Sequence, residues 1–253
     1  MVSTIKKETM NERTTLSPCR VCGGDAFTHH DVLWSELIAQ WGLSSGEAEY
    51  INVQQGTSCT GCGSNVRSIA LADALLRWTR AAMTLKEWVD TAAARRCDIL
   101  EINEAGTLSG TLSLLPGHRL VRYPECDMMT LPFEARSFDV VVHSDTLEHV
   151  PDATRGLREC RRVLRPGGAC LFTVPVVVGR LTRGRQGLPV SVHGSEGCTD
   201  ASLTVHTEFG ADVWCRVLES GFDECRIVPY RYPAGLALIA QVAESIPTEG
   251  GQW

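Results

Sequence analysis

The chain has no long apolar run, no excess of basic residues and no apolar signal segment at its start. None of its apolar stretches approaches the ~18 residues that a membrane-spanning helix needs, so we expect no such helix. Lysine and arginine total 24 against 30 aspartates and glutamates, a net charge of −6 that argues against bulk binding to nucleic acid or anionic membranes. The polar first residues favour a cytoplasmic location.

What is present is typical of a compact globular chain. With 253 residues, 43% of them hydrophobic, the sequence is long enough for one full α/β domain and a small appendage. The two polar ends, residues 1–17 and 243–253, are typical of flexible tails.

Four of the eleven cysteines have the spacing of metal ligands. Cys19 and Cys22 form one C-x-x-C pair, Cys59 and Cys62 form another, and a glycine after each pair lets the backbone turn around sulfur. Four thiolates close a tetrahedral Zn²⁺ site without an open position, so we predict a structural zinc-binding module over residues 18–66. Ordinary buried thiols and a redox dithiol are the alternatives, although nothing near either pair resembles a thioredoxin-like unit.

Helical patterns lie between the two cysteine pairs and after them. Apolar spacing predicts two helices in the intervening segment, around Val32–Trp41 and over Ser45–Gln55. Residues 67–94 are predicted to form helices that connect the zinc module to the rest of the chain. Arg67 either reaches an anionic group or lies solvated at a helix start.

Strand and helix patterns then alternate along residues 98–178. Asp98–Ile102 and Phe138–Val142 are short apolar runs, the second rich in β-branched residues, as in buried strands. A helical pattern, a Pro-Gly-Gly stop signal and a further apolar run at Ala169–Val178 follow. Strands joined by helices form a largely parallel sheet, which binds ligands at the carboxyl ends of its strands.

This stretch resembles the class I S-adenosylmethionine-dependent methyltransferases of the type-11 group. The resemblance lies in ILEINEAG at 99–106, DMMTLPF at 127–133, SFDVVVHSDTLEHVPD at 137–152 and ECRRVLRPGGACLFTVP at 159–175. It implies an α/β fold over residues 95–242, with a Rossmann-like, mostly parallel sheet and flanking helices, and S-adenosylmethionine as cofactor. It says little about the methyl acceptor.

The resemblance also implies a set of cofactor contacts. For Asp127, the carboxylate is expected to accept a hydrogen bond from the adenine amine, unless the residue only caps a turn. The matching positions are Glu101, Asn103 and Gly106 in the first loop, Glu125 for the ribose, Asp127 and Met128 for the adenine, and His143, Ser144 and Asp145 around the methionine end.

Two features depart from the family pattern. The first loop carries Asn103 and Ala105 where glycines usually stand, although asparagine tolerates positive φ better than most residues. We expect cofactor binding to be retained, with a shifted loop, altered affinity or lost activity as alternatives. In addition, only residues 116–127 separate the first helix from Asp127, which predicts a contracted sheet with His118–Tyr123 as its second strand.

A long loop over residues 179–205 is expected to overhang the acceptor site. Its arginines, Arg180, Arg183 and Arg185, either hold an anionic acceptor or solvate the loop. Three histidines are candidate bases because imidazole titrates near neutral pH: His149, His193 and His206. His149 alternatively packs against or caps the helix that follows it.

Together these patterns predict an S-adenosylmethionine-dependent methyltransferase acting at oxygen or nitrogen of a small-molecule or glycan-type acceptor. Three alternatives remain. They are an enzyme that cleaves or cyclises the cofactor, an RNA or protein methyltransferase with a basic face around residues 67–80, and a catalytically silent scaffold.

Overall fold

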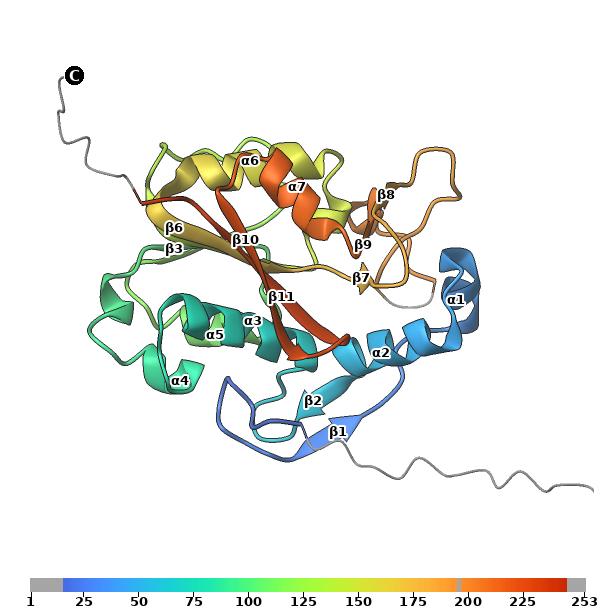
Figure 1. Ribbon diagram of the computed structural model, residues 1–253, viewed down its shortest axis with the longest axis horizontal. Helices are drawn as coiled ribbons and strands as arrows, with labels where there is room; N and C mark the ends of the chain where they lie inside the picture. Colours follow the sequence, from blue (N-terminus) through green and yellow to red (C-terminus); the bar gives the residue numbers. More distant parts are fainter. Residues whose placement is uncertain (1–15, 195–196, 245–253) are drawn as a thin grey trace, which may run out of the picture.

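The computed structural model of the protein describes residues 16–194 and 197–244, built around one central sheet (Figure 1). The predicted flexible tails lie mostly outside these residues. The strands of the sheet are β3 (Ile99–Ile102), β4 (His118–Val121), β5 (Phe138–Ser144), β6 (Leu164–Thr173), β10 (Glu224–Arg231) and β11 (Gly235–Gln241).

The order of these strands is β10-β11-β6-β5-β3-β4. Neighbours from β6 to β4 are parallel, whereas β11 and β10 run antiparallel to their neighbours. The predicted fold class, a Rossmann-like and mostly parallel sheet, is confirmed. The sheet is contracted as expected, because β4 is its edge and the chain passes from β4 to β5 without another helix and strand.

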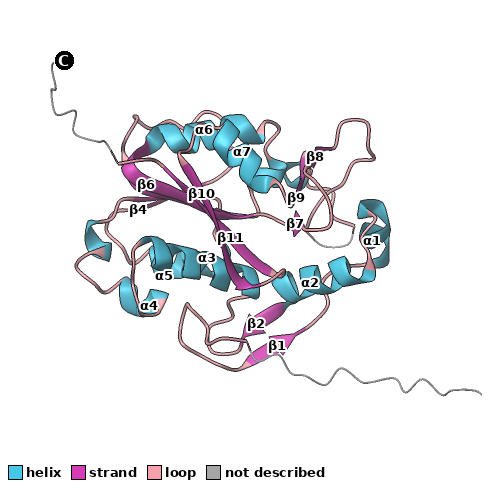
Figure 2. Ribbon diagram, in the orientation of Figure 1, coloured by secondary structure: helices cyan, strands magenta, loops and turns pink. Residues whose placement is uncertain are grey.

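Helices cover both faces of the sheet and give the molecule three layers (Figures 1 and 2). One layer holds α3 (Val66–Trp78), α4 (Leu85–Trp88) and α5 (Ser109–Leu112), and the other holds α6 (Ala153–Val163) and α7 (Val213–Glu219). Side chains of one strand alternate between the two cores: Val140 and Val142 pack with α3, and Val141 packs with α6. Burial on both faces is why β5 is apolar at successive positions.

The strand order places a ligand site at the ends of β3 and β5. From β3 the chain moves outward to β4, and it then crosses back to β5 on the other side. Open α/β sheets bind ligands at such a reversal, beyond the carboxyl ends of the strands. Asn103 and Asp145 are the residues that follow these two ends.

The segment that carries the cysteine pairs packs under the sheet. Its elements are β1 (Phe27–His29), α1 (Ser35–Trp41), α2 (Ser45–Gly56) and β2 (Thr57–Cys59), with β1 and β2 antiparallel. Helices therefore lie at both predicted positions, and a capping box between Ser44 and Glu47 starts α2. Cys19, Val21 and Cys59 belong to the same buried cluster as α3, so this segment shares a core with the sheet.

The predicted helical connection over 67–94 is interrupted. α3 ends at Trp78, where Arg80 takes a positive φ of 58°, and the short α4 follows. Four 3₁₀ turns lie elsewhere along the described chain, at Ala94–Arg96, Gly106–Leu108, Leu147–His149 and Ala201–Leu203.

The last predicted strand of the 98–178 stretch is split. β6 ends at Thr173, and Pro175, which has no N–H to donate to a strand ladder, precedes the separate β7 (Val176–Val177). β7 pairs with β9 (Thr207–Gly210), which also pairs with β8 (Arg183–Gly184). Strands at the two ends of the long loop, and one within it, therefore form a small separate sheet.

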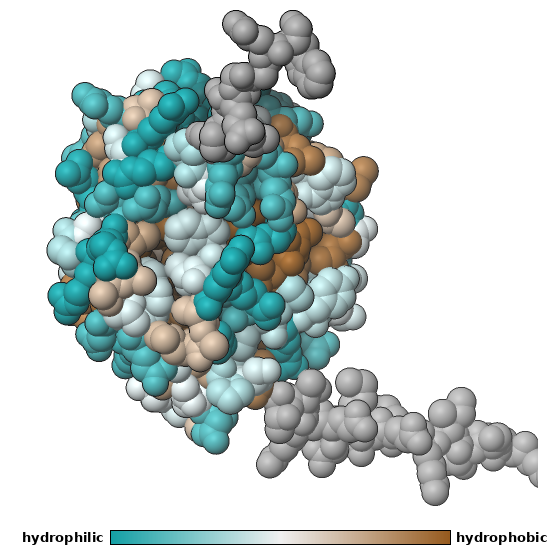
Figure 3. All heavy atoms as spheres, turned by 60° about the vertical axis from the view of Figure 1, so that its left-hand side comes forward, coloured by the Kyte–Doolittle hydropathy of each residue, from teal (hydrophilic) through white to brown (hydrophobic). Residues whose placement is uncertain are grey.

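One face of the molecule is mostly polar. The face drawn in Figure 3 is largely hydrophilic, with apolar side chains gathered in smaller areas. Among the described residues, no helix combines the length and the apolar character needed to cross a membrane.

Candidate functional site

Two cavities adjoin at the carboxyl ends of β3 and β5. The sheet-end cavity, of about 420 Å³, is lined by Asn103, Asp127 and their neighbours. The tryptophan cavity, of about 390 Å³, is lined by Trp34, Trp41 and their neighbours. Asp145 and His149 line both, so the two cavities share a boundary at these two residues.

The loop after β3 has the backbone that a glycine-rich loop would provide. Asn103 lines the sheet-end cavity at a positive φ of 53°, and its Oδ1 accepts a hydrogen bond from the Tyr123 amide at 3.1 Å. Gly106 has φ of 59°, and a Cβ there would stand 2.6 Å from Ser68 Oγ. Asparagine thus supports the left-handed turn, while Gly106 is needed for both its φ and its space.

Glu101 holds this loop in place. Its carboxylate is fully buried and accepts hydrogen bonds from the Ala105 amide at 2.7 Å and from Ser109 Oγ. Its other oxygen pairs with His118 Nε2 at 2.6 Å. We predicted Glu101 as a cofactor contact, but it lines neither cavity. Its hydrogen bonds instead fix the position of the loop.

Asp127 and Met128, predicted around the adenine, both line the sheet-end cavity. Asp127 also accepts a hydrogen bond from the Met129 amide at 2.8 Å, so the turn-capping alternative describes one of its oxygens. Glu125, the ribose candidate, is exposed and lies outside this lining. Arg122, which pairs with Glu104, lines the sheet-end cavity where Glu125 does not.

The three residues at the end of β5 have different environments. His143 is fully buried, stacks on Phe172 with ring centroids 4.9 Å apart, and lines neither cavity. Burial lowers its pKa to about 3, against an opposing effect of the Asp145 charge. Ser144 lines the sheet-end cavity, and its hydroxyl bonds Thr173 Oγ1 at 2.8 Å.

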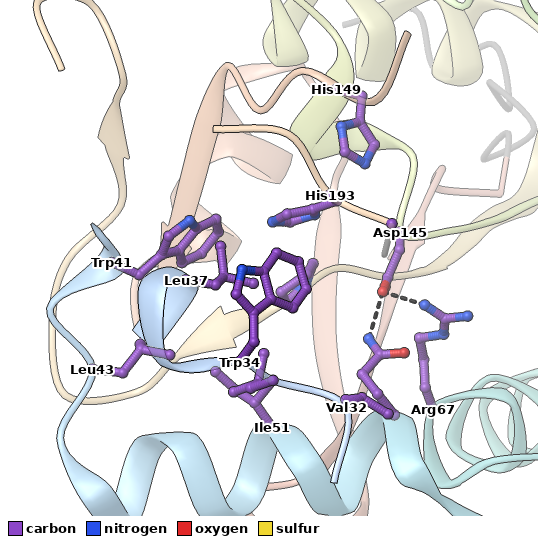
Figure 4. Close-up of a pocket in the computed structure, with 14 residues that line it drawn as sticks. Val32, Trp34, Leu37, Trp41, Leu43, Ile51, Arg67, Asp145, His149 and His193 are labelled. Carbon is purple, nitrogen blue, oxygen red and sulfur yellow. Dashed lines mark hydrogen bonds and ion pairs between the residues drawn. The ribbon is translucent and has the colours of Figure 1, made fainter. Parts of the chain in front are cut away.

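Asp145 joins the sheet to the N-terminal helices. It has a positive φ of 43°, which is uncommon for a residue other than glycine and concentrates at functional sites. Its Oδ2 accepts a hydrogen bond from Gln55 Nε2 of α2 at 2.7 Å and pairs with Arg67 of α3 (Figure 4). Arg67 therefore reaches an anionic group, and that group belongs to the chain itself.

The tryptophan cavity is built mainly by the segment between the cysteine pairs. Trp34, Trp41, Leu43 and Ile51 come from α1, α2 and the residues beside them (Figure 4). Trp41 Nε1 donates to Ser191 Oγ at 2.8 Å, which ties α1 to the long loop. An aromatic and aliphatic wall of this kind suits an apolar or flat ligand.

The three loop arginines neither hold an acceptor nor simply solvate the loop, which were the two roles predicted for them. Arg180 and Arg183 each lie 2.9 Å from Oε2 of the buried Glu208, and Arg185 contacts Oε1. None of the three lines either cavity. A buried carboxylate needs such partners, and the cluster fixes the loop against β9.

The candidate bases divide between the cavities. His149 lines both, His193 lines the tryptophan cavity, and His206 lines the sheet-end cavity. Burial lowers the pKa of His149 and lowers the pKa of His193 to about 4, so both rings are neutral near pH 7. The rings of His149 and His193 lie 5.2 Å apart, and His206 shares only the sheet-end cavity with His149.

The two cysteine pairs converge. Cys19 and Cys62 have sulfur atoms 3.7 Å apart, Cys22 and Cys59 have theirs 3.6 Å apart, and all four atoms lie within 4.8 Å of one another. Four thiolates around Zn²⁺ at about 2.3 Å stand about 3.8 Å apart, so the geometry fits this ion.

Sequence reasoning missed Trp34 and Gln55 as site residues, and also Glu148. For the tryptophan the only signal was its residue type, because aromatic side chains are frequent in pocket linings. Gln55 and Glu148 had no local signal, because their roles depend on partners distant in the sequence.

Comparisons with known proteins agree with this geometry. Residues 59–172 match the sequence family described as "Methyltransferase domain". A demethylmenaquinone methyltransferase of Corynebacterium kroppenstedtii is 35% identical over 98 residues, covering 35% of this chain and 43% of the relative. A phthiotriol/phenolphthiotriol dimycocerosates methyltransferase of Mycobacterium ulcerans is 44% identical over 75 residues, covering 29% of this chain and 27% of the relative.

The chain thus spans less than half the length of these curated relatives. Among solved structures, the DszA carbon methyltransferase has a TM-score of 0.41 at 13% identity, covering 70% of this chain and 53% of that one. A TM-score this low supports no conclusion about the fold beyond what the strand order shows. Residues 59–172 of this protein are therefore similar in sequence to a methyltransferase domain.

Proposed function

We propose that the protein transfers a methyl group from S-adenosylmethionine, bound in the sheet-end cavity, to a small molecule bound in the tryptophan cavity. The observation that carries this proposal is the shared boundary of the two cavities at Asp145 and His149. Methyl transfer is an in-line displacement, so donor and acceptor must meet across one such boundary.

The residues of the sheet-end cavity suit the cofactor. Its volume of about 420 Å³ lies within the usual range for small-molecule sites. Asp127 offers a carboxylate for the adenine amine, and Asn103 gives a tight backbone turn at the end of β3. When bound, S-adenosylmethionine supplies a methyl group on a positively charged sulfur atom, and the Asp145 carboxylate is the negative group at the boundary.

The tryptophan cavity favours an acceptor with an apolar or aromatic ring. Trp34 and Trp41 provide flat faces, and His149 and His193 add polar groups, with the His193 ring 5.1 Å from that of Trp41 (Figure 4). Either ring is placed to receive a proton from an acceptor hydroxyl or amine, since both are neutral near pH 7. Among glycan-type acceptors, those that present the apolar face of a sugar ring fit this wall.

A structural Zn²⁺ completes the proposal. Cys19, Cys22, Cys59 and Cys62 would hold the ion, which would fix both ends of the segment that forms the tryptophan wall. With four protein ligands the ion has no open position, so its role is folding and not chemistry.

The direct test is incubation with methyl-labelled S-adenosylmethionine and a panel of hydroxylated or aminated ring compounds. We expect S-adenosylhomocysteine and labelled product to form only when an acceptor is present. Cofactor consumed without an acceptor would instead indicate cleavage or cyclisation, and no turnover with any acceptor, together with no cofactor binding, would support a silent scaffold.

Trp34→Ala tests the acceptor wall. Loss of the indole should raise KM for the acceptor by about tenfold while leaving cofactor affinity within a factor of about two. Trp214→Ala, on the exposed part of α7, is the matched control and should change neither quantity. An unchanged acceptor KM in Trp34→Ala would place the acceptor elsewhere.

A further inference from the structure

We propose that Glu148, His149 and His193 form a second metal site, which binds a divalent transition-metal ion at the edge of the tryptophan cavity. The site is separate from the four cysteines. Its suggested effect on the acceptor rests on the proposed function, but metal binding itself does not.

The first support is the convergence of three ligand atoms. Glu148 Oε1 lies 3.7 Å from His149 Nε2 and 3.9 Å from His193 Nδ1, and the ligand atoms of all three residues lie within 4.8 Å of one another. Ligand atoms around an ion with bonds of about 2.1 Å stand roughly 3.0–4.2 Å apart. Inward movement of the two rings by less than about 1 Å would close such a site.

The second support is the state of the Glu148 side chain. It is 1% exposed, and neither carboxylate oxygen has a hydrogen-bond partner among the described residues. A buried carboxyl group without a partner costs roughly 1–3 kcal/mol or more, so structures seldom retain one without a ligand. Oε1 lies beside two imidazoles, which are common partners of a carboxylate around a metal ion.

The third support is the orientation of His149. Its Nδ1 lies 3.1 Å from the carbonyl oxygen of Thr204, to which it donates in the neutral ring. This hydrogen bond leaves the Nε2 lone pair facing Glu148. Histidines that bind metals usually donate their other N–H to a carbonyl or carboxylate in this way, which fixes the tautomer and the ring plane.

The surrounding charges are mixed. Asp145 places a negative charge and Arg67 a positive charge near Glu148, and Arg185 places a positive charge near His193. A divalent ion would take the place of the proton on Glu148, and the carboxylates of Glu148 and Asp145 would balance its charge.

The ligand set defines the class of ion. Two imidazoles and one carboxylate suit Zn²⁺ or Fe²⁺ and leave coordination positions open. His149 and His193 both line the tryptophan cavity, so these positions would face an acceptor there. With both imidazoles bound to the ion, neither would act as the base. The ion would instead hold the acceptor oxygen and promote loss of its proton, which favours hydroxyl-bearing ring compounds as substrates.

The test uses Co²⁺ added without oxygen to the full chain, with its tightly bound zinc retained. We expect about one Zn²⁺ and one Co²⁺ per chain by elemental analysis, and cobalt absorption without sulfur charge-transfer bands. Glu148→Gln and His193→Ala should lose the cobalt and keep the zinc. His206→Ala is the matched control, because this nearby histidine is outside the cluster, and it should keep both ions.

S-adenosylhomocysteine binding is measured on the same samples. Variants that bind it are folded, so loss of cobalt in them reports on the site. Two results would overturn the metal site: wild-type protein that binds the cofactor product but takes up no cobalt, and cobalt uptake that is unchanged in Glu148→Gln and His193→Ala. Neither result would affect the proposed function.

Discussion

At the scale of single residues, the site depends on a few backbone positions that ordinary residues rarely adopt. Asn103 and Asp145 have positive φ at the ends of adjacent strands, and both line the sheet-end cavity. The tolerance of asparagine for this conformation could be predicted from residue type. The role of Glu101 could not, because its partner His118 lies on the neighbouring strand and is set by packing.

Gly106→Ala tests the loop. A methyl group there meets Ser68 Oγ at 2.6 Å and must also adopt φ of 59°, so we expect a loss of about 1–3 kcal/mol in the free energy of unfolding and weaker cofactor binding. Gly110→Ala is the control, because its Cβ would meet nothing within 4 Å, and denaturant titration of both compares them. Equal stability of the two variants would contradict this account.

His143 makes a prediction for pH dependence. Burial puts its pKa at about 3 in the folded protein, below the ordinary value of 6.5, so the unfolded chain binds the extra proton between these values. Stability is therefore lost as pH falls from about 6.5 towards 3. His143→Leu should remove about 2 kcal/mol of the loss between pH 7 and 4.5, measured by denaturant unfolding at both values. The same loss in the variant would show that His143 does not contribute to it.

At the scale of elements, the segment between the cysteine pairs has two functions. It brings together the four thiols, and its helices form the tryptophan wall. The C-x-x-C spacing and the two helices could be predicted from the sequence, because both patterns are local. The contact of α1 with Ser191, about 150 residues away in sequence, could not.

We expect about one tightly bound Zn²⁺ per chain from the four cysteines, because closed thiolate sites couple binding to folding. Cys62→Ser should reduce the zinc content to below about half an equivalent and lower the melting temperature. Cys198→Ser, outside the cluster, should change neither. Elemental analysis and thermal unfolding give the two readouts, and freshly purified wild type with little zinc would refute the assignment.

At the scale of the whole molecule, function arises where distant segments meet at one edge of the sheet. The mostly parallel sheet follows from the alternation of strands and helices, and the contraction after the first helix was visible in the spacing. The two adjoining cavities could not be predicted from the sequence, because their walls come from α1, α2, the end of β5 and the long loop. The role of the loop arginines could not be predicted either, because their shared partner Glu208 lies outside the loop.

The most direct test of the account is calorimetric titration of S-adenosylhomocysteine into wild type, Asp127→Ala and Glu125→Ala. Asp127 lines the sheet-end cavity and Glu125 is exposed outside it. We predict one-to-one binding to wild type, a loss of roughly 1–3 kcal/mol for Asp127→Ala, and a change within about 0.5 kcal/mol for Glu125→Ala. Wild-type protein that binds no S-adenosylhomocysteine would contradict the central claim that this cavity holds the methyl donor.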